Sequence, residues 1–296
     1  MPKRLCLVLS ILVLSLVTLA PALTAQEEPA QPRIVSVLGA PAPGEIRLRL
    51  TDAQLESVEI PEIGYTAEDL FVADLSEVGL RLRHLGAGID GEIKSALGSM
   101  TFRTLRQPDG RVRVEHRLPN RRGTLVLLID NGAQTAEAAY PEGARINRAD
   151  RFVFRALAVA LARQLGDGTP ETDLLLRASR LWGAHPLQEV RLQRIAAPIE
   201  KSWTNLCGIT ARSLAHDGSG HGLISEYLAV GPKAYNCRSR CGAGCDAILG
   251  TSAWTVDCGE HDRCEQHHSC CTSCQDEFNS ASDDYLFAPN CRLSGW

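Results

Sequence analysis

The chain has no cysteine between Cys6 and Cys207, although its 296 residues include 11 cysteines. Ten of them lie from Cys207 to Cys291, so any disulfide framework is confined to the C-terminal part of the sequence. An even, clustered set of cysteines is typical of an exported domain in which disulfides compensate for a small local core. The spacing alone does not fix the pairing.

The sequence also lacks an excess of positive charge. Its formal net charge is -4, which argues against nucleic acid as a partner. The first 200 residues contain no internal repeat, no low-complexity tract and no nucleotide-binding loop, so they indicate no particular chemistry. The single histidines His84, His116 and His185 are isolated from other ionisable residues in the sequence, and we interpret them as structural or exposed.

No apolar run reaches the roughly 20 residues that span a bilayer. The run from Leu5 to Ala20 follows two basic residues and precedes small residues at Ala22 and Ala25. This pattern is typical of a secretory signal, so we predict a signal peptide over residues 1–25 and export to a periplasmic or extracellular location. An uncleaved membrane anchor is the alternative. Residues 26–33 are predicted to be a flexible lead-in.

Residues 34–200 are predicted to form a β-rich domain with two helices, of unknown function and with no identified protein partner. At 46–50, isoleucine and leucine alternate with arginine, the period of a strand with one wet face. The same reasoning predicts strands at 99–105, 112–115 and 124–129. A turn at 108–110 joins the first two of these, and Asn131-Gly132 predicts a tight hairpin turn with positive φ at both residues.

Two helices should follow the strands. The first is expected from Asn147 to Gly166, and a stripe of apolar residues marks its buried face: Phe154, Leu157, Leu161 and Leu165. The second has Thr169 as N-cap, Pro170 at the first helical position and Gly183 just past its end. Both apolar faces are predicted to lie in the core.

We place a second domain at residues 201–296. Its beginning is expected to be a short helix carrying Trp203, Cys207 and Leu214. A loop over 216–222 follows, in which His216, Asp217 and His221 lie close in sequence. The glycine-rich setting of these three residues favours a mobile turn over a pre-organised site.

The segment from Cys258 to Cys264 reads Cys-Gly-Glu-His-Asp-Arg-Cys. On a helix, Cys258 and Asp262 share one face, while His261 lies about 100° from Asp262, so the two adjacent side chains can serve different functions. Cysteines at both ends fix such a helix to its neighbours when they are oxidised. A catalytic pair requires that rigidity.

The upstream segment 240–245 reads Arg-Cys-Gly-Ala-Gly-Cys. Glycines at alternate positions let the backbone direct its carbonyls and amides toward one point. Ca²⁺ takes six to eight oxygen ligands, many of them backbone carbonyls. The loop therefore predicts a site for a hard cation, which the carboxylate of Asp262 would complete.

The loop and the His-Asp helix together resemble the secreted phospholipase A2 family, over Cys237 to Cys291. The resemblance implies a small, disulfide-linked α-helical domain and an overall α+β chain. It implies Ca²⁺ as cofactor, with the Gly242 amide stabilising the oxyanion. The implied metal ligands are the carbonyls of Arg240, Gly242 and Gly244 and the carboxylate of Asp262.

The resemblance also implies that His261 is the general base for a water that attacks the sn-2 ester of a glycerophospholipid in a membrane surface or micelle. In the family, an aspartate on an antiparallel helix orients the histidine. Asp276 is our choice for that role, because it follows Cys274, which is placed to staple the second helix to the first. Asp283 and Asp284 are the alternatives.

Two other functions remain open at this point. A structural zinc module could use closely spaced ligands: Cys264, His267 or His268, Cys271 and Cys274. A non-catalytic module could keep the phospholipase-like scaffold and bind lipid or a protein partner. From Cys237 to Trp296 there are nine acidic and four basic residues, so apolar contacts must carry any adsorption to lipid, and zwitterionic or neutral substrates are expected.

Overall fold

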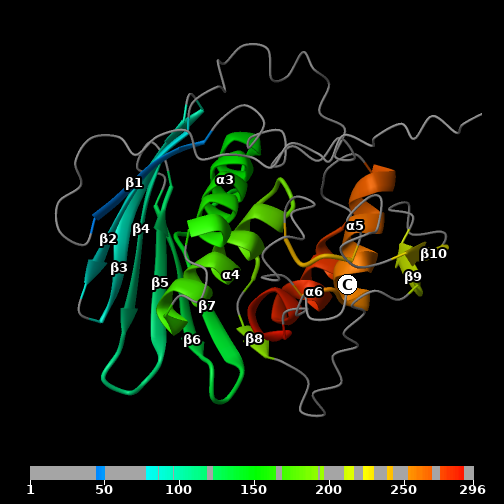
Figure 1. Ribbon diagram of the computed structural model, residues 1–296. Helices are drawn as coiled ribbons and strands as arrows, with labels where there is room; N and C mark the ends of the chain where they lie inside the picture. The colour runs from blue at the N-terminus through cyan, green and yellow to red at the C-terminus, as the bar shows by residue number, and fades with distance from the viewer. Residues whose placement is uncertain are drawn as a thin grey trace, which may run out of the picture. The chain divides into compact units, whose positions relative to one another are not determined.

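The computed structural model describes twelve stretches, all within one compact unit, Pro32–Trp296. They are residues 45–50, 78–85, 87–95, 97–118, 123–164, 169–192, 194–196, 210–216, 223–229, 239–242, 253–268 and 274–289. The predicted signal peptide and lead-in lie outside them. These stretches form an α+β protein, with an antiparallel sheet followed by helices (Figure 1). Among them, no helix has the length and apolar character to cross a membrane.

The sheet is an antiparallel meander whose strands lie side by side in chain order. Its strands are β1 (Glu45–Leu50), β2 (Val78–Leu85), β3 (Gly88–Ser95), β4 (Gly98–Arg106), β5 (Val112–Arg117), β6 (Thr124–Asp130), β7 (Thr135–Ala139) and β8 (Arg194–Ala196). Side chains alternate between faces, so in β5 Val112 and Val114 are buried while Arg113 and Arg117 are exposed. The strands predicted from alternation are confirmed.

Two helices, α3 (Arg148–Gln164) and α4 (Pro170–Ala184), cover one face of the sheet (Figure 1). Asn147 caps α3 reciprocally: its Oδ1 accepts from the Asp150 amide, and its own amide donates to Asp150 Oδ2, each at 2.9 Å. Thr169 and Pro170 begin α4 as predicted. The apolar faces of both helices lie in one core with the inner face of the sheet. Leu165 and Gly166 lie outside the described residues.

Gly183 does not end α4, so that prediction is wrong. The helix runs on to Ala184, and the Gly183 carbonyl accepts bonds from Arg151 Nε at 3.2 Å and Arg155 Nε at 2.8 Å. A Cβ at this position would lie 3.1 Å from Arg155 Cγ. The glycine therefore allows α3 and α4 to approach closely, a tertiary reason that sequence spacing does not reveal.

The predicted two-residue turn at Asn131-Gly132 is also wrong. Asp130 pairs with Thr135, which leaves four residues in the loop, and the positive φ occurs at Gln134, with a value of 53°. Asp130 Oδ1 accepts the Ala133 amide at 2.9 Å and stabilises this wider loop.

The C-terminal part contains a separate hairpin and two helices. The hairpin pairs β9 (Thr210–His216) with β10 (Leu223–Ala229), and the helices are α5 (Val256–His268) and α6 (Gln275–Phe287). Leu214 lies in a strand, so the prediction that it belongs to a short helix is wrong. Burial alternates from Arg212 to Ala215, the period of a strand rather than of a helix. Trp203 and Cys207 lie outside the described residues.

Among the described residues, two disulfides tie this part together, Cys241–Cys258 and Cys264–Cys274. The second joins α5 to the beginning of α6. Helix α6 also packs on α4, and Phe278 belongs to the same hydrophobic core as Trp182. The core is therefore continuous across residue 200, where the sequence predicts a domain boundary. That boundary stays a prediction.

Candidate functional site

Helix α5 carries the predicted His-Asp pair on two different sides. Its start is fixed by Thr255, whose Oγ1 accepts the Cys258 amide at 3.2 Å. The His261 side chain is 1% exposed and the Asp262 side chain 26%. The histidine thus faces the interior, while the aspartate faces the loop that precedes the helix.

The loop at 239–242 is held directly against α5. The Cys241–Cys258 disulfide joins the two segments, and the Ser239 amide donates to Asp262 Oδ2 at 2.9 Å. Gly259 makes this approach possible, because a Cβ there would lie 2.3 Å from Ser239 Oγ. The structure therefore holds Arg240 to Gly242, the described part of the predicted cation loop, against the helix that carries Asp262, and the neighbouring Ser239 bonds to its carboxylate.

The donor set fits a calcium site only in part. Carboxylate and carbonyl oxygens are the ligands that Ca²⁺ prefers, and burial raises the pKa of the Asp262 carboxyl, an effect that a neighbouring cation would oppose. The Gly242 amide, however, donates to the Arg240 carbonyl at 2.9 Å, so these two groups satisfy each other. The side chain of Arg180 also packs over Gly242. Gly244 lies outside the described residues.

His261 is surrounded by aromatic and acidic side chains. Its ring centroid is 5.7 Å from that of Phe278 and 6.4 Å from that of Tyr285. Nδ1 is 3.9 Å from Asp262 Oδ1, and Nε2 is 3.7 Å from Glu265 Oε1. Neither ring nitrogen has a hydrogen-bond partner among the described residues. A buried imidazole without partners is costly, so a water, substrate or ion at this position would stabilise it.

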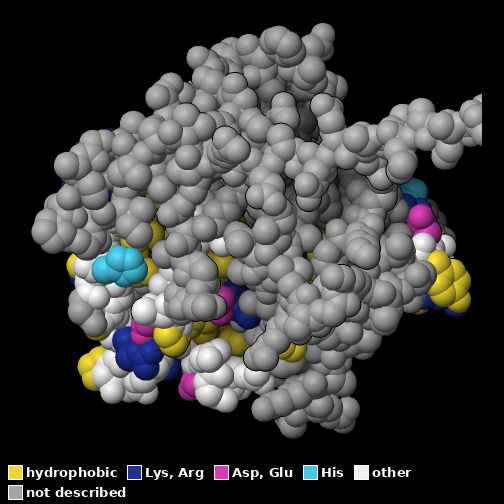
Figure 2. Space-filling view, in the orientation of Figure 1, with side chains coloured by type: hydrophobic (Ala, Val, Ile, Leu, Met, Phe, Trp, Pro, Cys, Tyr) yellow, Lys and Arg dark blue, Asp and Glu magenta, His cyan; other side chains and the backbone are white. Residues whose placement is uncertain are grey.

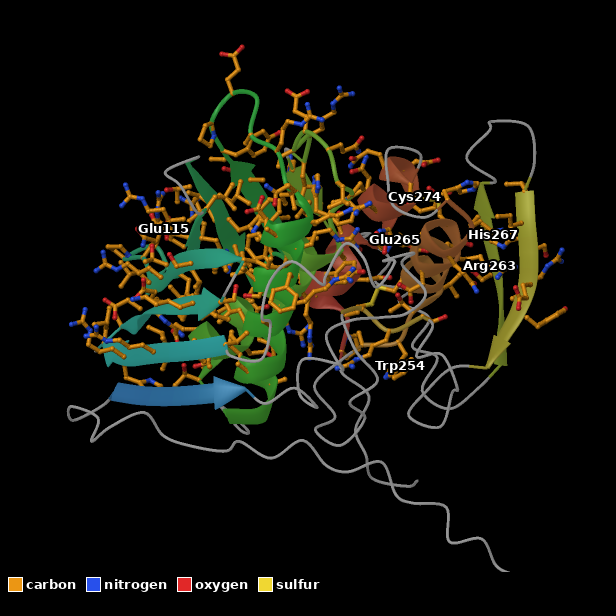
Figure 3. The ribbon with its side chains drawn as sticks, turned by 90° about the horizontal axis from the view of Figure 1, so that it is seen from above. Glu115, Trp254, Arg263, Glu265, His267 and Cys274 are labelled. Atoms are coloured by element: carbon orange, nitrogen blue, oxygen red, sulfur yellow. A yellow bond between two sulfur atoms is a disulfide. The ribbon has the colours of Figure 1, made fainter. Side chains whose placement is uncertain are left out.

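Glu265 is the residue that sequence reasoning missed. Its spacing of four from His261 places both residues on one side of the helix. Arg151 Nη2 donates to its two oxygens at 2.7 and 3.0 Å, and Arg155 Nη2 lies 3.9 Å from Oε2. Burial alone would raise the pKa of Glu265, but the charges of Arg151, His261 and Arg155 outweigh it and lower the pKa. In Figure 3, Glu265 lies on the side of α5 toward α3 and α4.

The aspartates considered for orienting His261 all lie on α6. Asp276 is exposed, whereas Asp283 and Asp284 are buried. An Asp284 oxygen lies within 4.8 Å of the sulfurs of the Cys241–Cys258 disulfide. Burial, with the charges of Asp283 and Asp257 adding to it, raises the pKa of Asp284 to about 8. The carboxylate found beside His261 Nε2 is that of Glu265.

The isolated histidines of the N-terminal part have different surroundings. His84 is exposed, and His116 is fully buried against Phe154, with burial lowering its pKa to about 3. His185 is buried too, and its ring packs 4.9 Å from that of Phe278. Burial lowers its pKa to about 4. His185 is therefore not isolated in space, because Phe278 also contacts His261.

The zinc alternative is wrong, because the disulfide between Cys264 and Cys274 consumes two of its thiolates. Cys271 lies outside the described residues. Asp217 and His221 also lie outside the described residues. His216 is the last residue of β9.

The β9–β10 hairpin presents an apolar outer face. Its inner face, with Ser213 and Ala215 buried, packs against α5. The opposite face carries the exposed large hydrophobic residues Leu214, Leu223 and Tyr227, with exposed fractions of 39%, 64% and 72%. The strand pairing places these three residues on the same side. Hydrophobic side chains are visible in Figure 2 at the edge where Figure 1 places this hairpin.

One family profile matches the chain, described as a domain of unknown function (DUF8213), over residues 188–293. The matched segment begins before β8 and contains the hairpin, both C-terminal helices and both disulfides. Comparison with curated proteins and with solved structures gives no match. The match covers the candidate site, and its description states no activity.

Proposed function

We propose that this protein is an exported, calcium-dependent phospholipase A2-like esterase that hydrolyses the sn-2 acyl ester of glycerophospholipids. One observation carries the proposal: the disulfide-clamped loop at 239–242 contacts the Asp262 carboxylate directly beside the buried, unpartnered imidazole of His261. The sequence resemblance supplies the reaction, and this juxtaposition supports it.

His261 would act as the general base. Its Nδ1 faces Asp262 and the loop, so a water bound there donates its proton to Nδ1 as its oxygen bonds to the ester carbonyl carbon. The proton then passes to the departing alkoxide, giving a free fatty acid and a lysophospholipid. The Gly242 amide would stabilise the oxyanion after it turns from the Arg240 carbonyl. Ca²⁺, when held by Asp262 and the loop carbonyls, would polarise the ester carbonyl.

The outer face of the hairpin would carry adsorption to lipid. Leu214, Leu223 and Tyr227 combine aliphatic and aromatic groups, which enter the interface of a bilayer or micelle. The exposed Arg212 lies on the same face. The occupant proposed for this face is a zwitterionic phospholipid surface, because nine acidic and four basic residues from Cys237 to Trp296 do not favour anionic lipid.

The test is fatty-acid release from phosphatidylcholine vesicles by the full exported chain, with and without Ca²⁺. We expect calcium-dependent release that His261→Gln abolishes. His267→Gln is the matched control, since His267 is an exposed histidine on the same helix. Release that persists in His261→Gln, or that ignores removal of Ca²⁺, would contradict the mechanism.

A non-catalytic lipid-binding module is the second candidate. The bond between the Gly242 amide and the Arg240 carbonyl favours it, because that bond occupies the oxyanion donor. Vesicle binding without fatty-acid release, unchanged by His261→Gln, would establish this function instead.

A further inference from the structure

We infer that Glu265 is the positioning residue for His261 and that Arg151, on α3, holds Glu265 in place. The inference rests on the proposed function, and it gives the N-terminal region a direct part in the site. Residues that lie 114 positions apart in the chain thereby form one unit.

Distances and burial support this assignment. Glu265 Oε1 lies 3.7 Å from His261 Nε2 and accepts a bond of 2.7 Å from Arg151 Nη2. The side chains of Arg151 and Glu265 are 0% and 7% exposed. A charged hydrogen-bonded pair in such surroundings has a fixed geometry, because water does not compete for either group. Glu265 is thus held where its oxygen faces the imidazole.

The position of that oxygen determines the role of each ring nitrogen. In a neutral imidazole, one nitrogen carries the proton and the other accepts one. A carboxylate beside Nε2 favours the proton there, and Nδ1 is left as the acceptor. Asp262 Oδ1 lies 3.9 Å from Nδ1 and attracts the proton in the same way, but Glu265 is nearer, at 3.7 Å from Nε2, and its side chain is 7% exposed against 26% for Asp262, so water screens its charge less. Nδ1 is also the nitrogen that faces Asp262 and the loop. The Glu265 carboxylate therefore selects the tautomer that general-base chemistry at the loop requires.

Phe278 and Tyr285 support the same arrangement. Their rings lie 5.7 and 6.4 Å from the ring of His261, so the imidazole has little room to turn over and exchange its nitrogens. Asp276, exposed on α6, is not required in this arrangement.

The experiment separates positioning from structural support. Replacing both charges, in Arg151→Met with Glu265→Leu, removes the ion pair together with its two buried charges, and Arg155, which lies 3.9 Å from Glu265, keeps its bond to the Gly183 carbonyl, so the double variant should stay folded. We expect kcat on phosphatidylcholine to fall about 100-fold or more, with KM nearly unchanged. The matched control is Arg106→Met with Glu171→Leu, which removes another long-range ion pair and should preserve kcat.

The second readout is independent of activity. Histidine ¹⁵N chemical shifts, assigned with His261→Gln, report which nitrogen of His261 carries the proton. We expect the Nε2–H tautomer in the wild type and a loss of that preference in the double variant. Unchanged tautomer populations would overturn the inference, as would a folded double variant with wild-type kcat. If the wild type releases no fatty acid, the proposed function fails, while the tautomer result still decides the role of Glu265.

Discussion

Replacement of Arg151 alone should reveal how strongly the ion pair supports the fold. In Arg151→Met, the Glu265 carboxylate stays 7% exposed, but it loses the guanidinium that donates to both of its oxygens. Breaking a buried pair by removing one partner costs about 3–5 kcal/mol. For a chain of this size, that corresponds to a fall in Tm of about 6–20 °C.

The loss should depend on pH. In the wild type, the pKa of Glu265 is lowered by folding. The ionised carboxylate therefore contributes to the free energy of unfolding above the unfolded pKa, and this contribution is lost as the pH falls through the folded pKa. Without Arg151, which makes the largest of the contributions that lower the pKa of Glu265, the folded pKa moves up toward the unfolded one. The destabilisation should then be largest near neutral pH and should shrink on acidification toward the unfolded pKa of about 4.3.

Urea unfolding of the wild type and the variant over a pH series measures both effects. Arg113→Met is the control, because Arg113 pairs with Glu115 on the exposed face of the sheet, where such a pair contributes about 1 kcal/mol or less. A loss below about 1 kcal/mol in Arg151→Met, or a loss that grows on acidification, would refute the reasoning.

Three further predictions concern other parts of the structure. Since burial raises the pKa of Asp284 to about 8, the free energy of unfolding of the wild type should fall as the pH rises from about 4 to that value, by at most about 1.4 kcal/mol per pH unit. Chemical denaturation should show that Asp284→Asn removes this slope. Gly259→Ala should push the loop at 239–242 away from α5 and lower the free energy of unfolding by about 1–3 kcal/mol. Adding Ser239→Gly should restore that stability in thermal unfolding, since it removes the clashing side chain at a residue that already has a positive φ. Leu223→Ser with Tyr227→Ser should weaken binding to phosphatidylcholine vesicles about tenfold or more in a sedimentation assay, whereas Ser225→Ala, on the same face, should not.

Periodicity predicted the sheet because half-buried strands record their two faces in the sequence. The alternation at 46–50 and the hairpin around 108–110 both match strands in the structure. Thr169 and Pro170 identified the start of α4 for a similar reason, since the preference of proline for the first helical position is a local property of the chain. These features depend on neighbours in the sequence.

The predictions that failed depend on tertiary contacts. Gly183 has the residue type of a helix end, but α3 packs against it. Asn131-Gly132 has the composition of a tight turn, but the pairing of Asp130 with Thr135 widens the loop. Leu214 was predicted to lie in a helix because a short apolar segment does not distinguish the period of a helix from that of a strand.

The candidate site likewise combines local features, which the sequence predicts, with tertiary contacts, which it does not. The His-Asp pair and the glycine-bearing loop were visible as a motif, because their residues are close in sequence. The partner of His261 Nε2 was sought on α6, where the family resemblance placed an aspartate, yet Glu265 lies on the same helix as the histidine. Its spacing of four was a usable signal, but Arg151, which fixes it, comes from α3.

The larger N-terminal region thus has a physical connection to the site even though its own sequence indicates no chemistry. Arg151 of α3 supplies the charge that balances Glu265. His185, just after α4, packs on Phe278, which also contacts the ring of His261. A small disulfide-linked pair of helices has too little core to keep an imidazole and a carboxylate buried and fixed by itself. Packing these helices on α4 and pairing Glu265 with Arg151 provide that burial. The β-rich region therefore shares a hydrophobic core with these helices and supplies, through Arg151, the charge that holds Glu265 in place.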